Sequence, residues 1–406
     1  MKRRLTALFL LAAAAFSLCG CARVFDTEYV VETSFEPVVN VAAPEEDDDA
    51  TAVSFDDLKE VLRDMVAQGD ASRILHFDPA YEGDVSADLA NACWQIRTQD
   101  ALCAYCVENI SYEVFKIVNR YEALLSVSYS QTAEALESIV HLPYAADAGE
   151  LLREAMADGQ PSLILLIERS SYTAEGMEDF ALQTYHETPT ITPLEPEIHV
   201  SMTSGADTQR LYVFELDYGL PETERRARRD AMEALDLFPG MDVSGLGEAE
   251  RALLACCALI VRSRCSEDTR KHSVYDALIG CEADDHGLAL AYVEYCRRLG
   301  LACEIVHGQR GGEEYSWNIV EIDGAYYHVD AAACSRQGLA AGFLLDDESA
   351  WGDYRWDYFA YPHCTGPLHG ADVVYPPPAH AEAEAGPVEE GVDAEAGNSE
   401  AQENTP

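Results

Sequence analysis

The sequence predicts an α+β protein in which two tandem α/β repeat modules precede a domain that packs one helix on an antiparallel sheet. Two observations lead to this prediction. Residues 51–220 contain an internal repeat at an offset of about 90 residues, and such a repeat indicates two structural units of similar size. After residue 285, an apolar helix pattern is followed by three runs rich in β-branched and aromatic residues, which is typical of strands.

The internal repeat aligns residues 62–69 on 152–159 without gaps, and residues 72–77 on 162–167. Each copy is expected to form a helix, a strand, a second helix and a pair of strands, so the modules are predicted at 51–140 and 141–220. Ser54 with Asp57 predicts a capping box at the first helix. Neither copy carries a Gly-rich phosphate loop, a nucleophile motif or a His-rich cluster, so a spacer or protein-binding role is expected.

The third domain is predicted at residues 221–370 and begins with helices over 222–237 and 247–264. Its central helix has apolar residues at one-face spacing from Leu288 to Leu299, and Gly300 is expected to end it. Strands are expected over 301–307, 315–322 and 325–330. Asp323-Gly324 joins the last two strands and is a strong signal for a tight hairpin. The result is a helix followed by an antiparallel meander.

This part of the chain also carries a family pattern. The matching positions are Tyr275, Ala277, Leu278, Ala283, Gly287, Ala289, Leu299-Gly300, Trp317-Asn318, Asp323-Gly324 and Tyr327-His328-Val329-Asp330. Their order and spacing resemble the core of the transglutaminase-like superfamily, which is related to the papain-like thiol enzymes. The resemblance implies a Cys at the start of the helix, a His at the start of the second strand, an Asp at the end of the third, and a substrate cleft near Trp317 and Asn318.

The nucleophile and the base of that family are replaced in this chain. The Cys position is Asp285, the His position is Tyr315, and only Asp330 matches the family triad. A thiolate with an imidazole base is what such chemistry needs, and a tyrosine with a reference pKa near 10 is not a base at neutral pH. Aspartate is a favoured N-cap, so Asp285 is expected to cap the helix. The domain is therefore predicted to be a non-catalytic pseudoenzyme.

Two rebuilt sites remain as alternatives. Cys281 lies four residues before Asp285, and His328 lies on the same strand face as Asp330, so these three could form a displaced triad in a cysteine peptidase or transferase. Alternatively, Asp284 or Asp285 could pair with Asp330 for carboxylate acid/base hydrolysis, as in glycoside hydrolysis.

The N-terminus indicates export. Lys2-Arg3-Arg4, an apolar run over 5–16 and Leu18-Cys19-Gly20-Cys21 have the layout of a signal peptide, and the last four residues resemble a bacterial lipobox. The resemblance implies removal of residues 1–20 and a lipid on Cys21, which would anchor the protein on the outer side of the cell membrane. Residues 21–50 are predicted to form an acidic tether.

Composition limits the partners. The formal net charge of −46 argues against nucleic acid, and residues 371–406, rich in Ala, Glu, Gly and Pro, are predicted to be a disordered tail. Removing Cys19 and Cys21 from the 13 cysteines leaves an odd number, so at least one is expected to be free or to pair between molecules. Cys103 and Cys106 form the only C-x-x-C pair, without a second pair, so no metal and no cofactor are predicted. The expected role is binding of a peptide, protein or cell-wall ligand, or service as a scaffold.

Overall fold

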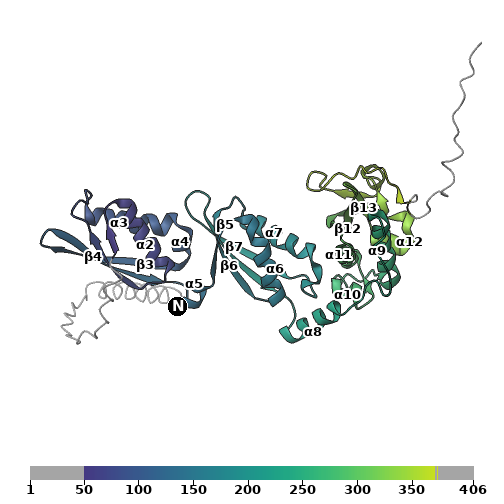
Figure 1. The fold of residues 1–406 in the computed structure, drawn as a ribbon, viewed down its shortest axis with the longest axis horizontal. Helices are drawn as coiled ribbons and strands as arrows, with labels where there is room; N and C mark the ends of the chain where they lie inside the picture. Colours follow the sequence, from purple (N-terminus) through teal and green to yellow (C-terminus); the bar gives the residue numbers. More distant parts are fainter. Residues whose placement is uncertain (1–49, 371–372, 374–406) are drawn as a thin grey trace, which may run out of the picture. The chain divides into compact units, whose positions relative to one another are not determined.

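The computed structural model describes residues 50–370 and 373 (Figure 1). The predicted signal peptide, the lipid attachment at Cys21, nearly all of the tether and nearly all of the acidic tail lie outside the described residues. Among the helices that the structure describes, none has the length and apolar character needed to cross a membrane.

The first module is a four-stranded sheet in the order β1-β2-β4-β3, with helices on one face (Figure 1). β1 pairs with β2 in parallel, and the other neighbours pair antiparallel. The predicted capping box is confirmed, since Ser54 Oγ accepts from Asp57 N–H at 3.2 Å and Asp57 Oδ2 accepts from Ser54 N–H at 2.8 Å. The elements are β1 (Ala50–Ala52), α2 (Phe55–Ala67), β2 (Ser72–Phe77), α3 (Val85–Gln99), α4 (Ala101–Cys106), β3 (Val107–Ile117) and β4 (Arg120–Tyr129).

The second module has a sheet in the order β5-β6-β8-β7, again with one parallel pair followed by antiparallel pairs. The two sheets therefore share one strand order, although the predicted module boundaries at residues 51 and 141 fall inside β1 and β5. The elements are α5 (Ala133–Glu137), β5 (Ile139–Tyr144), η1 (Ala145–Asp147), α6 (Ala148–Asp158), β6 (Ser162–Arg169), α7 (Ala174–Glu187), η2 (Pro189–Ile191), β7 (Glu197–Ser204) and β8 (Arg210–Asp217).

The C-terminal domain contains a five-stranded antiparallel sheet in the order β14-β13-β12-β11-β15. The sequence predicted the three central strands but not the edge strands β14 and β15. The elements are α8 (Glu222–Glu233), α9 (Glu248–Arg262), β9 (Arg264–Cys265), α10 (Val274–Leu278), β10 (Glu282–Ala283), α11 (Asp285–Arg298), β11 (Cys303–Arg310), β12 (Glu313–Ile322), β13 (Ala325–Val329), α12 (Ala331–Gln337), η3 (Leu339–Ala341), β14 (Phe343–Leu345), α13 (Asp347–Ala350) and β15 (Tyr354–Trp356).

Helix α11 is the centre of the C-terminal domain, and it is buried on all sides. Residues 287–296 are all buried, because the helix packs on β12 and is covered by α9 and α10. The expectation of a single packed face was therefore wrong. Gly300 has a φ of 69° just after the helix, as the sequence predicted for a residue that ends it. The tight hairpin is also confirmed, since Asp323 and Gly324 both have positive φ and join paired residues Ile322 and Ala325.

Hydrophobic packing links the second module to the C-terminal domain. One continuous core contains Leu165 and Phe214 from the second sheet together with Leu288 and Tyr292 from α11. The first module has its own core, to which the second sheet adds residues such as Leu166. A third, smaller core lies around Trp317 in β12.

Candidate functional site

The structure brings the side chains of Tyr315 and Asp330 into contact. Tyr315 lies in β12, and Asp330 directly follows β13 and caps α12. The Tyr315 hydroxyl lies 3.1 Å from Asp330 Oδ1 and 3.0 Å from Oδ2. The two side chains therefore meet where β12 lies beside the end of β13.

Three further donors hold the Asp330 carboxylate. Arg310 Nη1 donates at 2.9 Å, the Tyr354 hydroxyl at 2.6 Å and the Ala333 backbone N–H at 2.7 Å. Asp330 is only 1% exposed. The guanidinium of Arg310 also lies over the rings of Tyr315 and Tyr354. We call these four side chains, Arg310, Tyr315, Asp330 and Tyr354, the Asp330 cage.

The pKa values of the cage residues argue against base catalysis. Burial raises the pKa of Tyr315 and of Tyr354 above the usual range of a phenol, and the nearby Asp330 carboxylate adds to the effect. Burial also raises the pKa of Asp330, against the lowering effect of its hydrogen bonds and of Arg310. At neutral pH both phenols remain protonated and donate hydrogen bonds to Asp330. Neither can therefore accept a proton from a nucleophile.

Asp285 does not cap α11, which corrects the sequence interpretation. The N-cap is Asp284, whose Oδ1 accepts from Gly287 N–H at 2.9 Å, and burial raises the pKa of Asp284. Asp285 is the first helical residue, and its Oδ2 accepts from Ser316 N–H at 2.7 Å. Asp285 therefore ties the start of α11 to β12 at the residue after Tyr315.

The two predicted cleft residues are buried on opposite sides of β12. Trp317 is 1% exposed, packs in the third core, and donates its indole N–H to His328 Nδ1 at 3.0 Å. Asn318 is 0% exposed and donates from Nδ2 to the Ala289 carbonyl of α11 at 3.1 Å. Both side chains therefore belong to packed interior and do not line an open cleft.

The displaced triad of Cys281, His328 and Asp330 is not assembled in this structure. Cys281 is exposed, has a φ of 57°, and its thiol contacts the carbonyl of Ile279 in its own loop. His328 is buried, and both ring nitrogens are engaged, because Nδ1 accepts from Trp317 and Nε2 lies 3.0 Å from Asp347 Oδ1. The ring is therefore unavailable to a thiol, and Asp330 is already occupied by its cage.

Sequence reasoning overlooked Cys265 as a thiol close to the frame. It lies in β9, which pairs with β10 just before α11, and the charges of Asp284, Asp285 and Asp330 act on it. Burial raises the pKa of the Cys265 thiol to about 11, and those carboxylates contribute to the shift, against a lowering effect of Arg336. A nucleophilic cysteine needs the opposite shift, so Cys265 is held as a thiol.

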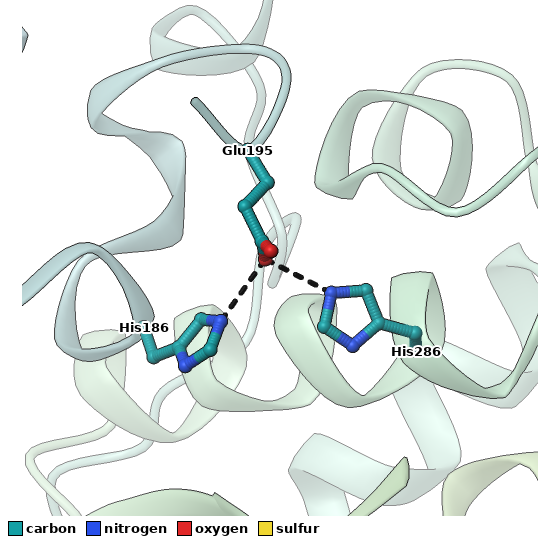
Figure 2. A group of neighbouring side chains, drawn as sticks. All are labelled: His186, Glu195 and His286. Atoms are coloured by element: carbon teal, nitrogen blue, oxygen red, sulfur yellow. Dashed lines mark hydrogen bonds and ion pairs between the residues drawn. The ribbon is translucent and has the colours of Figure 1, made fainter. Parts of the chain in front are cut away.

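A second group of polar side chains was also missed. His186 Nε2 and His286 Nε2 each lie 3.0 Å from Glu195 Oε2, as Figure 2 shows. His186 is in α7, Glu195 lies just before β7, and His286 follows Asp285 in α11. We call these three residues the His–Glu–His cluster. The sequence offered little indication of this cluster, because His186 and His286 are 100 positions apart. Only His286 lies next to a residue of the pattern that resembles the family.

Two cavities border the His–Glu–His cluster. A cavity of about 540 Å³ is lined by Glu195 and His286 together with Glu178, Asp179 and Glu197. A second cavity, of about 260 Å³, is lined by His186 and by residues of β11 and β12. The cluster is therefore accessible from open space.

Comparisons with known proteins gave weak similarities. No protein-family model matches the chain, and no curated protein matches it. Among solved structures, a transglutaminase described as a TGase is 8% identical, with a TM-score of 0.24, over 47% of this chain and 58% of that chain. A candidate cysteine protease from Cytophaga hutchinsonii is 10% identical, with a TM-score of 0.21, over 34% of this chain and 62% of that chain. The chain thus spans less than two thirds of either protein.

Proposed function

We propose that this protein is a lipid-anchored surface scaffold, whose C-terminal domain has a transglutaminase-like frame that lacks thiol catalysis. The observation that carries the proposal is the Asp330 cage, in which one buried carboxylate accepts from Arg310, Tyr315 and Tyr354 at 2.6 to 3.1 Å. In a thiol enzyme this carboxylate would orient an imidazole. Here every donor belongs to a fixed side chain or to the backbone, so the pair of Tyr315 and Asp330 serves stability.

The burial of Trp317 and Asn318 favours a scaffold role rather than binding of a peptide at these two residues. A binding cleft needs concave, accessible surface, and these two side chains provide none. The two N-terminal modules, which we infer to be copies of one unit, would then hold the C-terminal domain away from the anchor. Their common strand order supports this inference.

An amide-hydrolysis assay tests the absence of thiol catalysis. We expect the wild-type protein and Cys281→Ser to show the same background hydrolysis of a generic protein substrate, because the Cys281 thiol has no free imidazole beside it. The measurement is release of new amines from the substrate, with and without a thiol-blocking reagent. Thiol-sensitive hydrolysis by the wild type that disappears in Cys281→Ser would establish the alternative of an active cysteine enzyme.

The double variant Asp285→Cys with Tyr315→His tests the frame itself. We expect it to fold, because the first position is only half-buried at the start of α11 and the second keeps a ring that can donate to Asp330. Circular dichroism measures the fold. Collapse of the double variant, with each single variant also unfolded, would show that these positions do not correspond to the nucleophile and base of the family.

Replacement of Cys21 tests the lipid anchor. We expect Cys21→Ser, expressed in a bacterial host, to move the protein from the membrane pellet to the soluble fraction, because the lipid supplies the membrane affinity. Labelling with a fatty acid analogue should be lost in the same variant. Cys19→Ser is the matched control and should keep both the label and the membrane association. Retention of Cys21→Ser in the membrane would rule out a lipid at this residue as the anchor.

A further inference from the structure

We propose that the His–Glu–His cluster of His186, Glu195 and His286 binds a divalent transition metal ion, with Zn²⁺ the best fit to its donor atoms. One ligand atom from each of His186, Glu195 and His286 lies within 4.8 Å of the other two. They come from helix α7, the loop before β7 and helix α11, and the two imidazoles point at the Glu195 carboxylate, as Figure 2 shows. Two imidazoles and one carboxylate are a known set of protein ligands for zinc with an open fourth position.

The distances agree with those around a bound ion. Zinc bonds of about 2.0–2.1 Å in a tetrahedral arrangement place neighbouring ligand atoms about 3.3 Å apart. The cluster has each imidazole Nε2 at 3.0 Å from Glu195 Oε2. Each imidazole would need to move away from Glu195 Oε2 by only a few tenths of an ångström, and the two imidazole nitrogens already lie within 4.8 Å of each other.

A supporting shell orients the cluster. Ser316 Oγ lies 3.3 Å from His286 Nδ1 and 3.3 Å from His307 Nδ1, so one hydroxyl positions two imidazoles. The backbone N–H of Ser316 is in turn fixed by Asp285. Metal-binding histidines commonly use their second ring nitrogen in this way. Asp285, which replaces the family nucleophile, would thus help to position a neighbouring metal ligand.

His307 is the residue closest to a fourth ligand. Its ring centroid lies 5.1 Å from that of His186 and 5.7 Å from that of His286. The remaining coordination position would belong to His307 or to water.

The surroundings favour a cation over an anion. The 540 Å³ cavity that reaches Glu195 and His286 is lined by the carboxylates of Glu178, Asp179 and Glu197, and no Lys or Arg is among its lining residues. A divalent ion would therefore reach the cluster through a cavity lined by carboxylates.

A second group of potential ligands in the described residues, His328, Asp347 and Cys364, has a structural explanation. Asp347 accepts from the backbone N–H of Cys364 at 3.1 Å and pairs with His328, whose other nitrogen accepts from Trp317. Its polar atoms are engaged inside the domain, so we assign no ion to it.

Metal titration of the full-length protein tests the proposal. After chelator treatment and dialysis in detergent, Zn²⁺ is titrated by calorimetry and Co²⁺ by absorption spectroscopy. We expect one equivalent to bind, with a cobalt spectrum free of the thiolate charge-transfer band. Glu195→Gln and His286→Asn should each lower the affinity by more than about 100-fold, and Ser316→Ala by about 10-fold, the lower end of the loss typical of an outer-shell partner.

His141→Ala is the matched control, because His141 is an exposed histidine of β5 outside the cluster. The affinity of this variant for Zn²⁺ should equal that of the wild type. Circular dichroism identifies which variants are folded, and either folded ligand variant is sufficient for the comparison. The proposal is overturned if the folded wild type binds no equivalent of Zn²⁺, if a folded Glu195→Gln or His286→Asn variant binds as tightly as wild type, or if the cobalt spectrum shows thiolate ligands. If both ligand variants unfold, an unchanged affinity in Ser316→Ala overturns it, and a loss supports it.

Discussion

Replacing Asp330 by alanine is expected to lower the free energy of unfolding of the C-terminal domain by about 3–5 kcal/mol, the cost typical of breaking a buried ion pair. The change leaves Arg310 without its carboxylate and removes the acceptor of Tyr315 and Tyr354. It also removes the cap on the Ala333 N–H at the start of α12. Urea unfolding followed by tryptophan fluorescence measures the effect, because Trp317, Trp351 and Trp356 all report on this domain.

The matched control is Asp353→Ala, which removes an exposed aspartate of the same domain and should change stability by no more than about 0.5 kcal/mol. Tyr315→Phe removes one donor of the Asp330 cage and should cost about 1 kcal/mol. If Asp330→Ala proves as stable as Asp353→Ala, Asp330 is not held by buried donors, and the explanation of the replaced triad fails.

Trp317→Ala is expected to lower the free energy of unfolding by about 3–5 kcal/mol, because it empties the centre of the third core. The ring centroid of Trp317 lies 5.0 Å from that of Tyr354 and 5.9 Å from that of Trp356. The packing is tight, since a Cβ added to Gly308 would come within 2.8 Å of the Trp317 ring. The change also leaves His328 Nδ1 without its donor. Thermal unfolding followed by circular dichroism measures the loss.

Trp317→Phe keeps an aromatic ring and loses only part of the volume and the indole N–H, so it should be less destabilising than Trp317→Ala. This pair of variants also shows whether Trp317 lies in a packed core or lines an open cleft. A residue that lines an open cleft can be truncated at little cost, so a Trp317→Ala variant as stable as the wild type would restore the expectation of a cleft at this position.

The central helix and the meander were predictable because their signals are local. Gly300 and the Asp323-Gly324 pair fix chain reversals through positive φ angles, and these are properties of a few adjacent residues. The edge strands β14 and β15 were not predictable, because each has only three residues and no alternation can be seen over so short a run.

The cap of α11 shows a different limit. Asp284 and Asp285 are adjacent and have equal intrinsic capping tendency, so the sequence alone cannot assign the role. Tertiary structure decides it, since Asp285 finds the backbone N–H of Ser316 on β12 and leaves Asp284 to cap the helix. The resemblance to the transglutaminase-like pattern rests on residue spacing, and spacing carries an uncertainty of one residue at helix starts.

The His–Glu–His cluster could not be predicted from sequence, because its residues meet only through packing of the second module against the C-terminal domain. His186 and His286 are far apart along the chain, and no motif spacing joins them to Glu195. The shared core of these two parts brings them together. The Asp330 cage was missed for a different reason, because Tyr354 belongs to strand β15, which the sequence did not predict.

The rate of alkylation of Cys265 as a function of pH, measured residue by residue by mass spectrometry, tests the absence of an activated thiol most directly. With its pKa raised to about 11 from an ordinary 9.0, Cys265 should react about 100-fold more slowly than an ordinary thiol at neutral pH, and its rate should rise with pH towards 11. A Cys265 rate that levels off near neutral pH, together with amide hydrolysis that is lost in Cys265→Ser, would show a working thiolate at the frame and contradict the proposed scaffold.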